Sequence, residues 1–230
     1  MKNTKLSIII PCYNEEKTII KILTKINKIK LDGIKKEIIV IDDCSNDSSL
    51  VLLQNNKRLY SKLITNEKNI GKGASLKKGI DCAKGDIIMV QDADLEYDPK
   101  EYKKMLDLLY SNDCDVVYGS RFYNKKYDKG NIINRIANKF FTYLFNKMYR
   151  NNLTDILTCY KLFRREIFDE IELIENRFCF DTEISIKLTK KNKRIFEVPI
   201  SYYPRSKKEG KKIGLKDGVA ITFLLIKNRY

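Results

Sequence analysis

The fold is decided by the stretch Ile87-Ile88-Met89-Val90-Gln91-Asp92-Ala93-Asp94-Leu95-Glu96, which joins an apolar run to three acidic residues. Four consecutive apolar residues predict a short buried strand. The three acids alternate with other residues, so their carboxylates would point to one side of an extended backbone. Such oxygens are the ligands that Mg²⁺ and Mn²⁺ prefer. The stretch therefore predicts a strand end with a divalent-metal site, although acidic residues also follow strands that bind nothing.

Short apolar runs alternate with amphipathic segments along the first half of the chain. Strands are expected over 6–10, 37–41, 63–65, 87–90 and 116–118, and helices over 19–29, 48–57, 76–83 and 99–109. The second half is less regular, with helices expected over 133–148, 166–174 and 184–188 and a strand over 196–200. Short strands separated by helices are typical of an α/β fold with a mostly parallel central sheet and helices on both faces.

Polar side chains follow three of the expected strands. The first strand is followed by Tyr13, Asn14 and Glu15, the second by Asp42 and Asp43, and the fourth by Asp92 and Asp94. Ligands of open parallel sheets bind at the carboxyl ends of the strands. We therefore expect these three loops to meet at one edge and to form the binding site.

The composition excludes several kinds of chemistry. A length of 230 residues without a Gly/Ser/Pro-rich linker favours one domain. Because the chain has no histidine, Ser-His-Asp catalysis, histidine-ligated zinc and histidine general bases are excluded. The six cysteines include no Cys-x-x-Cys pair and are typical of reduced thiols in a cytoplasmic protein. Carboxylates, phosphates and metal ions remain as the reactive groups.

The net charge of +15 is concentrated in residues 121–150 and 205–230, which together carry +13. Two basic segments favour a localised anionic partner, such as a phosphate, a diphosphate or anionic lipid headgroups. Nucleic acid would suit the charge, but the sequence contains no nucleic-acid recognition motif, so we expect no such partner. A solvated basic surface is the alternative interpretation.

The sequence predicts no membrane-spanning segment, so any membrane contact is expected to be peripheral. The longest late apolar run, 219–226, has eight residues, whereas a transmembrane helix needs roughly 20, and no signal peptide is visible. We expect a cytoplasmic protein, either free or bound to the cytoplasmic membrane face. The expected helix over 133–148 has an apolar stripe interrupted by basic residues. A core helix is the favoured interpretation of this pattern, and a helix lying on a membrane is the alternative.

Three motifs, each after a strand, resemble those of the family 2 glycosyltransferases: Pro11-Cys12-Tyr13-Asn14-Glu15, Ile41-Asp42-Asp43-Cys44-Ser45 and Asp92-Ala93-Asp94. Further matches resemble the branch of dolichyl-phosphate mannose and glucose synthases. They are Asn69-Ile70-Gly71-Lys72-Gly73, Tyr118-Gly119-Ser120-Arg121-Phe122, Thr158-Cys159-Tyr160-Lys161-Leu162-Phe163 and Val198-Pro199-Ile200-Ser201-Tyr202-Tyr203 before Arg205. The resemblance implies an α/β nucleotide-diphospho-sugar transferase fold (A-type glycosyltransferase fold). It also implies a donor half, 1–120, and an acceptor half with a basic C-terminal segment, 121–230.

The resemblance also implies a donor site for a UDP- or GDP-hexose and a Mg²⁺ or Mn²⁺ cofactor. Its residues would be Pro11, Tyr13, Asn14, Glu15, Ile41, Asp42, Asp43, Lys72, Asp92, Ala93, Asp94, Arg121, Arg205, Lys211 and Lys212. Asp43, alone or with Asp42, would accept from a ring N–H of the base. Asp94 would be the main metal ligand, with Asp92 and Glu96 beside it. Many relatives carry glutamine at the position of Glu96.

In this branch the acceptor is commonly a polyprenyl phosphate at a membrane surface, and the reaction inverts the anomeric centre. An ionised phosphate needs no general base. Arg121 and Arg135 match positions that hold this phosphate, so with Asp94 they are the expected catalytic residues. A glycan or other hydroxyl acceptor is the alternative, and Asp155, Asp181 or Glu183 would then be the base. The sequence specifies neither the sugar, the base nor the oligomeric state.

Overall fold

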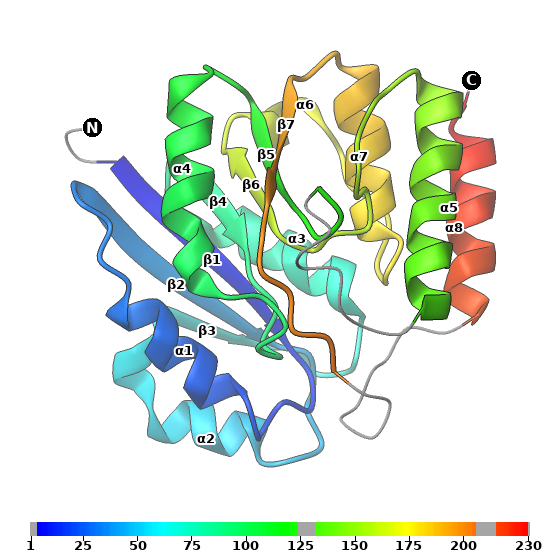
Figure 1. Cartoon of the computed structure of the whole chain (residues 1–230). Helices are drawn as coiled ribbons and strands as arrows, with labels where there is room; N and C mark the ends of the chain where they lie inside the picture. Colours follow the sequence, from blue (N-terminus) through cyan, green and yellow to red (C-terminus); the bar gives the residue numbers. More distant parts are fainter. Residues whose placement is uncertain (1–3, 124–131, 206–214, 230) are drawn as a thin grey trace.

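A seven-stranded sheet forms the centre of the computed structural model, which describes residues 4–123, 132–205 and 215–229 (Figure 1). Its strands lie in the order β3-β2-β1-β4-β6-β5-β7, and among these neighbours β6 alone runs antiparallel. The bounds are β1 (Thr4–Cys12), β2 (Ile34–Asp42), β3 (Lys62–Thr65), β4 (Ile87–Val90), β5 (Val116–Ser120), β6 (Lys161–Arg164) and β7 (Ile195–Pro199). The prediction of a mostly parallel α/β sheet is confirmed.

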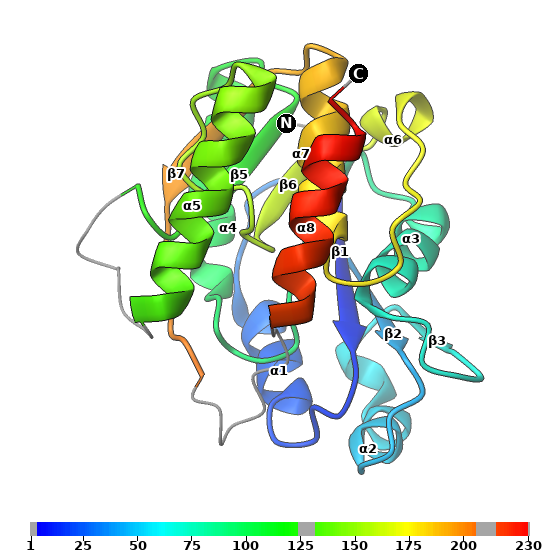
Figure 2. The ribbon, with the colours of Figure 1, turned by 90° about the vertical axis from the view of Figure 1, so that its right-hand side faces the viewer.

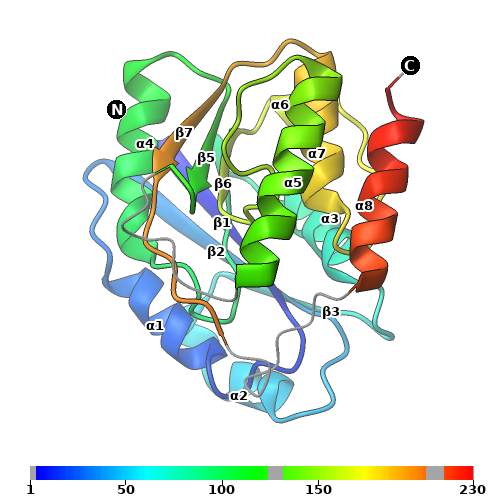
Figure 3. The same ribbon diagram turned by 45° about the vertical axis from the view of Figure 1, so that its right-hand side comes forward.

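Helices cover both faces of this sheet (Figures 2 and 3). One face packs against α1 (Ile19–Lys28), α2 (Ser49–Asn55) and α4 (Tyr102–Ser111). The other packs against α3 (Lys72–Cys82), α5 (Ile132–Tyr149), α6 (Ile167–Glu170), α7 (Phe180–Lys190) and α8 (Leu215–Lys227). Two short 3₁₀ turns, Lys57–Leu59 and Pro99–Glu101, precede β3 and α4.

Side-chain alternation along the strands explains the two cores. In β1, Ile8 and Ile10 belong to the core under α1 and α4, whereas Ile9 belongs to the core under α3 and α7. All three are fully buried, because successive strand residues point to opposite faces and both faces are covered. Parallel strands then bring the carboxyl ends of β1, β2 and β4 to one edge, as expected from the sequence.

Two elements were not predicted. The strand β6 carries a buried lysine, Lys161, and ends at Arg164, so its composition is not typical of a buried strand. The helix α8 begins before the apolar run 219–226, which alone was too short to indicate a helix. One predicted helix is shorter than expected: the helix predicted over 166–174 ends at Glu170.

The helix α5 has two apolar rows. Phe145 is fully buried, and Phe141, Leu144 and Met148 pack partly against the same core. The second row is exposed and consists of Ile132, Ile133, Ile136, Phe140 and Tyr143. The core-helix interpretation thus accounts for only half of the apolar pattern. In the described part of the chain, no helix is long and apolar enough to cross a membrane.

Candidate active site

The three loops at the carboxyl ends of β1, β2 and β4 share a strained backbone. Each contains a non-glycine residue with positive φ: Asn14 at 54°, Cys44 at 61° and Leu95 at 66°. Asparagine tolerates this conformation, but for a bulky residue such as leucine it is an outlier that the surrounding structure must enforce. Strained residues of this kind concentrate at binding and catalytic sites. Three of the described non-glycine residues with positive φ thus lie at the same edge of the sheet as the polar motifs, whereas Asp113, Arg150 and Asn192 lie elsewhere.

The acidic stretch after β4 is a turn rather than an extended segment, so the predicted reason for its geometry is wrong. The positive φ of Leu95 reverses the chain between Asp94 and Glu96. Asp94 Oδ1 accepts from the Glu96 amide at 3.0 Å within this turn. Asp92 instead forms an ion pair of 2.5 Å with Lys72 at the start of α3. The three carboxylates are close in space, but they face different partners.

Arg205 joins two of the three loops. Its guanidinium donates to both oxygens of Glu15, with the closest contact at 2.9 Å, and to Asp94 Oδ2 at 2.9 Å. Burial, together with the neighbouring charges of Asp92 and Glu96, raises the pKa of Asp94 to about 7, although Arg205 opposes the shift. Arg205 thus serves as the cation that this group of carboxylates requires. Glu15 was predicted as a donor-site residue, and here it is bound to arginine.

The predicted three-ligand metal site is not formed in this arrangement. Among residues 4–123, 132–205 and 215–229, no group of three or more carboxylate or thiol side chains could hold a metal ion together. The physical reason is that Asp92 faces Lys72, while both oxygens of Glu96 accept from Tyr202 and Arg205. Asp94 still suits a divalent cation, because its carboxylate is an oxygen ligand that lies near two further carboxylates, Asp92 and Glu96. A metal ion there would have to replace Arg205.

Asp42 and Asp43 are both buried at the end of β2, but they differ in how they are bonded. Asp43 accepts from the amides of Ile70 and Gly71 and from Asn66 Nδ2, at 2.8–3.0 Å. Asp42 Oδ2 accepts from the Ser45 amide at 3.1 Å. Among the described residues, Asp42 Oδ1 has no hydrogen-bond partner although it is buried. Asp43 was the preferred base-binding residue, yet Asp42 is the one with a buried acceptor oxygen to which no described residue donates.

Gly71 explains why the loop held by Asp43 can approach so closely. Its φ is 95°, and a Cβ atom there would lie 2.4 Å from the carbonyl oxygen of Asn176. Only glycine combines this backbone conformation with this contact. The loop from Asn66 to Gly71 is thereby pinned between β2 and the segment before α7, and it places Lys72 against Asp92.

Arg121, at the end of β5, is locked by Asp155. Its Nε and Nη2 donate to the two oxygens of Asp155 at 2.7 and 2.8 Å, and its own amide donates to the same carboxylate. The amides of Thr154 and Asp155 donate in turn to Glu197 on β7. Burial and the charge of Asp155 raise the pKa of Glu197 to about 7. The predicted phosphate-binding arginine is therefore rigidly held rather than solvent-flexible.

The three candidate bases are all engaged in bonds. Asp155 is fully buried under Arg121. Glu183 accepts from the amides of Ile174 and Glu175 and pairs with Lys187. Asp181 pairs with the buried Lys161 at 3.1 Å and accepts from Cys159 Sγ at 3.3 Å. These contacts are typical of groups that support a site.

The remaining predicted residues lie as follows. Pro11 is in β1 and Ile41 is in β2, Tyr13 is half-buried in the loop after β1, and Ala93 is buried in the turn after β4. Arg135 is half-buried in the first turns of α5. Lys211 and Lys212 lie outside the described residues. Their roles stay predictions.

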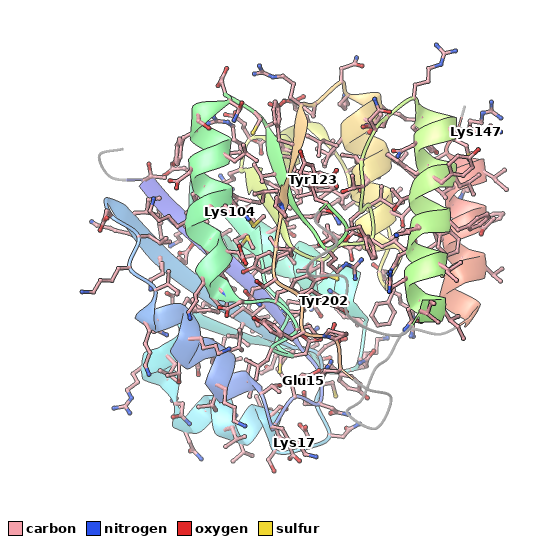
Figure 4. The ribbon with its side chains drawn as sticks, viewed as in Figure 1. Glu15, Lys17, Lys104, Tyr123, Lys147 and Tyr202 are labelled. Atoms are coloured by element: carbon pink, nitrogen blue, oxygen red, sulfur yellow. The ribbon has the colours of Figure 1, made fainter. Side chains whose placement is uncertain are left out.

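Tyr202 was quoted in a motif but given no role. Its hydroxyl donates to Glu96 Oε2 at 2.9 Å, and its ring lies under the Arg121 guanidinium, 5.2 Å from ring centroid to Cζ. In the view of Figure 4, Tyr202 lies near the middle with Glu15 below it, whereas Lys147 lies at the edge. The signal in the sequence was an aromatic residue shortly before Arg205 in a motif already matched.

Comparisons with known proteins show the family to which the chain is similar. The model of glycosyl transferase family 2 matches residues 7–172. A dolichol-phosphate mannosyltransferase of Pyrococcus furiosus is 30% identical over 220 residues, covering 90% of this chain and 59% of its own length. A dolichyl-phosphate beta-glucosyltransferase of Dictyostelium discoideum is also 30% identical, with 87% and 67% covered. The chain thus spans about three fifths to two thirds of these curated relatives.

Solved structures share the fold. Glucosyl-3-phosphoglycerate synthase of Mycobacterium tuberculosis, in complex with UDP, has a TM-score of 0.76 at 17% identity, covering 99% of this chain and 80% of its own. Mannosyl-3-phosphoglycerate synthase of Rubrobacter xylanophilus has a TM-score of 0.76 at 18% identity, with 98% and 72% covered. The fold is therefore the A-type glycosyltransferase fold, as the sequence predicted. With the family match over most of its length, the chain belongs to glycosyl transferase family 2.

Proposed function

We propose that this protein is an inverting, metal-dependent hexosyltransferase that uses a UDP- or GDP-sugar and transfers the hexose to a polyprenyl phosphate. The observation that carries the proposal is the group in which Arg205 joins Glu15 and Asp94, with the locked Arg121 nearby across Tyr202. The site has acidic and basic side chains but no histidine, which suits the transfer of a sugar between two phosphates, because an ionised phosphate needs no general base. The two relatives named for dolichyl-phosphate glycosyl transfer support this choice of acceptor.

On the donor side, each residue has a defined task. Asp42 Oδ1, buried and available, would accept from a ring N–H of uracil or guanine. Arg205 would leave Glu15 and Asp94 and donate its paired N–H groups to the diphosphate. Asp94, with Asp92, would then hold Mg²⁺ or Mn²⁺, which when bound neutralises the departing diphosphate. A solved relative contains Mn²⁺ with UDP, which supports this cofactor.

On the acceptor side, a phosphate oxygen would attack the anomeric carbon opposite the leaving group. The new carbon–oxygen bond forms as the bond to the diphosphate breaks, so the configuration inverts. Arg121 would hold the attacking phosphate with the N–H groups that Asp155 leaves free to bond. Because the phosphate is already ionised, the engagement of Asp155, Asp181 and Glu183 in other contacts is compatible with the reaction.

We further propose that the protein meets its acceptor at a lipid surface through what we call the α5/α8 face. The two helices contact each other and lie side by side in Figures 2 and 3. Their exposed apolar side chains are Ile132, Ile133, Ile136, Phe140 and Tyr143 on α5 and Val219, Phe223 and Ile226 on α8. A patch of this kind on two adjacent helices marks an interaction site, and the basic residues of α5 suit anionic headgroups.

A thermal-shift panel with UDP, GDP and dTDP, each with and without Mn²⁺, tests the donor part of the proposal. A diphosphate at about 100 times its Kd stabilises the folded protein by about 2.7 kcal/mol, which is a shift of about 5–10 °C for a chain of this size. We expect such a shift with UDP or GDP, and a larger one with Mn²⁺. Equal curves for all nucleotides, with and without metal, would contradict the proposal.

A further inference from the structure

A loop without regular structure holds the end of β5. Residues 153–156, which we call the 153–156 loop, lie between α5 and β6 and belong to no helix or strand. Asp155 accepts from the amide, Nε and Nη2 of Arg121 at 2.7–3.1 Å. Thr154 Oγ1 lies 2.6 Å from Ser120 Oγ, within hydrogen-bond distance. The loop therefore fixes both the backbone and the guanidinium of the predicted acceptor arginine where the chain leaves the strand.

Two polar side chains of α5 bond the backbone of this loop. Asn146 Oδ1 accepts from the Leu153 amide at 3.1 Å, and Asn146 Nδ2 donates to the Leu153 carbonyl at 2.7 Å. Thr142 Oγ1 accepts from the Ile156 amide at 3.3 Å. Backbone groups that leave water need such partners, so the loss of either side chain would leave an N–H or C=O group without one. The helix α5 thus supports the loop from one side.

The strand β7 supplies the other support, through Glu197. Its two carboxylate oxygens accept from the amides of Thr154 and Asp155 at 2.7 and 3.1 Å. Bonds from N–H groups to a carboxylate are charge-assisted and stronger than bonds between neutral groups. The backbone of Asp155 is thus held by one carboxylate, while its own carboxylate holds Arg121. Glu197 therefore reaches the arginine through the loop.

We propose that Glu197, Asn146 and Thr142 are positioning residues for the acceptor arginine. They hold the 153–156 loop, the loop presents Asp155, and the carboxylate of Asp155 sets the orientation of the guanidinium. Loss of a bond to the loop raises the population of molecules in which the loop has opened locally and the arginine is released. The proposal rests on the proposed function for what the arginine binds, but its release is measured without any substrate.

Phenylglyoxal, which reacts with arginine side chains, measures this release. The rate of modification at each arginine is read by mass spectrometry of the peptides. Arg121 is only 9% exposed and is bonded to Asp155, so it should react slowly, and chiefly when the loop opens. Arg58 is exposed and serves as the reference for the reagent. Arg164 on β6, whose Nε donates to the Cys114 carbonyl at 3.0 Å, reports any general loosening of the sheet.

Three variants each remove part of the support. In Glu197→Gln an NH₂ group replaces one of the oxygens that face the two loop amides, and in Asn146→Ala both bonds to the loop are lost. Thr142→Val keeps the shape of the side chain and removes only the acceptor, so it serves if another variant does not fold. The matched control is Glu37→Gln, the same substitution on β2, where the carboxylate accepts from the Lys84 amide at 2.8 Å.

The rates are compared at about pH 8, above the pKa of Glu197 of about 7, so that this carboxylate is mostly ionised in the parent. We expect Arg121 to react about three- to tenfold faster in the three variants, as for the loss of hydrogen bonds, while Arg58 and Arg164 react as in the parent. In the control, all three arginines should react as in the parent. An unchanged rate at Arg121, or an equal rise at Arg164, would overturn the positioning role.

Kinetics with a UDP- or GDP-sugar, Mn²⁺ and polyprenyl phosphate give the second readout. In the three variants we expect the KM for the lipid phosphate to rise about three- to tenfold. The KM for the sugar nucleotide and the Mn²⁺ requirement should stay within about twofold of the parent, because the released arginine belongs to the acceptor side. An equal rise of both KM values would overturn the proposal. If the parent transfers no sugar, the proposed function fails, and the modification of Arg121 still decides the positioning role.

Discussion

Two neighbouring aspartates illustrate how burial alone fails to distinguish a structural group from a binding group. Asp42 and Asp43 are exposed by only 1% and 3%. Both oxygens of Asp43 accept hydrogen bonds from amides of the loop before α3. Asp42 has one buried oxygen to which no described residue donates. A buried acceptor without a partner is costly, and a ligand that donates to it removes that cost. The bonding partners therefore assign the two carboxylates to different tasks.

We expect Asp43→Asn to lower mainly the stability and Asp42→Asn to lower mainly the affinity for the nucleotide. In Asp43→Asn the amide group would face a backbone N–H, so the free energy of unfolding should fall by about 1–3 kcal/mol. In Asp42→Asn the side chain has one acceptor oxygen for both the Ser45 amide and the ring N–H of the base. The affinity for UDP or GDP should therefore fall about tenfold or more, with little change in the free energy of unfolding. Urea denaturation and calorimetric titration measure the two effects. The reverse pattern would return base recognition to Asp43.

At the scale of elements, the segment between α5 and β6 is held to β7 by Glu197. Its pKa of about 7 lies above the ordinary value of 4.5, because it is buried beside Asp155. The folded state therefore binds more protons than the unfolded state between these values, and stability falls as pH rises through this window. Arg121 depends on the same contacts, since Asp155 orients it.

We expect the stability of the parent to decrease between about pH 4.5 and pH 7 by at most about 3 kcal/mol from this group. The chain has no histidine, so few other side chains titrate there, and Asp94, with its own raised pKa, is common to parent and variant. Glu197→Gln removes this ionisation, so the free energy of unfolding of the variant should decrease less than that of the parent over this pH range. The measurement is urea denaturation at several pH values. Parallel curves for the two proteins would contradict this assignment.

The α5/α8 face gives a second prediction at this scale. Phe140→Gln and Phe223→Gln should each weaken binding to vesicles of phosphatidylcholine and phosphatidylglycerol about tenfold, since part of a Phe side chain's burial, worth about 1.5–3 kcal/mol in full, is lost. The matched control is Val51→Gln on α2, a helix on the other side of the sheet, where the side chain is 56% exposed. Co-sedimentation measures the effect. Equal loss in the control, or none in either variant, would exclude this face.

At the scale of the whole molecule, much of the architecture could be predicted from the sequence. Apolar runs such as Ile87–Val90 gave the parallel strands, because strands buried on both faces must be apolar throughout. The strand β6 could not be found, since its Lys161 is buried among tertiary contacts, among them an ion pair with Asp181, a residue 20 positions away. The apolar pattern of α5 also could not show which row would be covered.

The site was predictable as a set of residues but not as a set of bonds. The motifs gathered Glu15, Asp94 and Arg205 correctly at one edge. The sequence could not reveal that Leu95 turns the backbone and that Glu96 accepts from Tyr202 and Arg205, in the segment after β7. It also could not show that Asp155 holds Arg121, because the two residues lie 34 positions apart and meet only in the fold. Partners of this kind depend on tertiary contacts that no local pattern encodes.

The central claim is the transfer of a hexose to a lipid phosphate, and one incubation tests it directly. The protein is mixed with radiolabelled UDP- or GDP-hexose, Mn²⁺ and polyprenyl phosphate, and the label is followed into the organic phase, with Asp94→Asn as the background. We predict organic-phase label in the parent that is lost in Asp94→Asn. Label that stays in the aqueous phase, while a soluble glycan or other hydroxyl compound becomes labelled, would contradict the account.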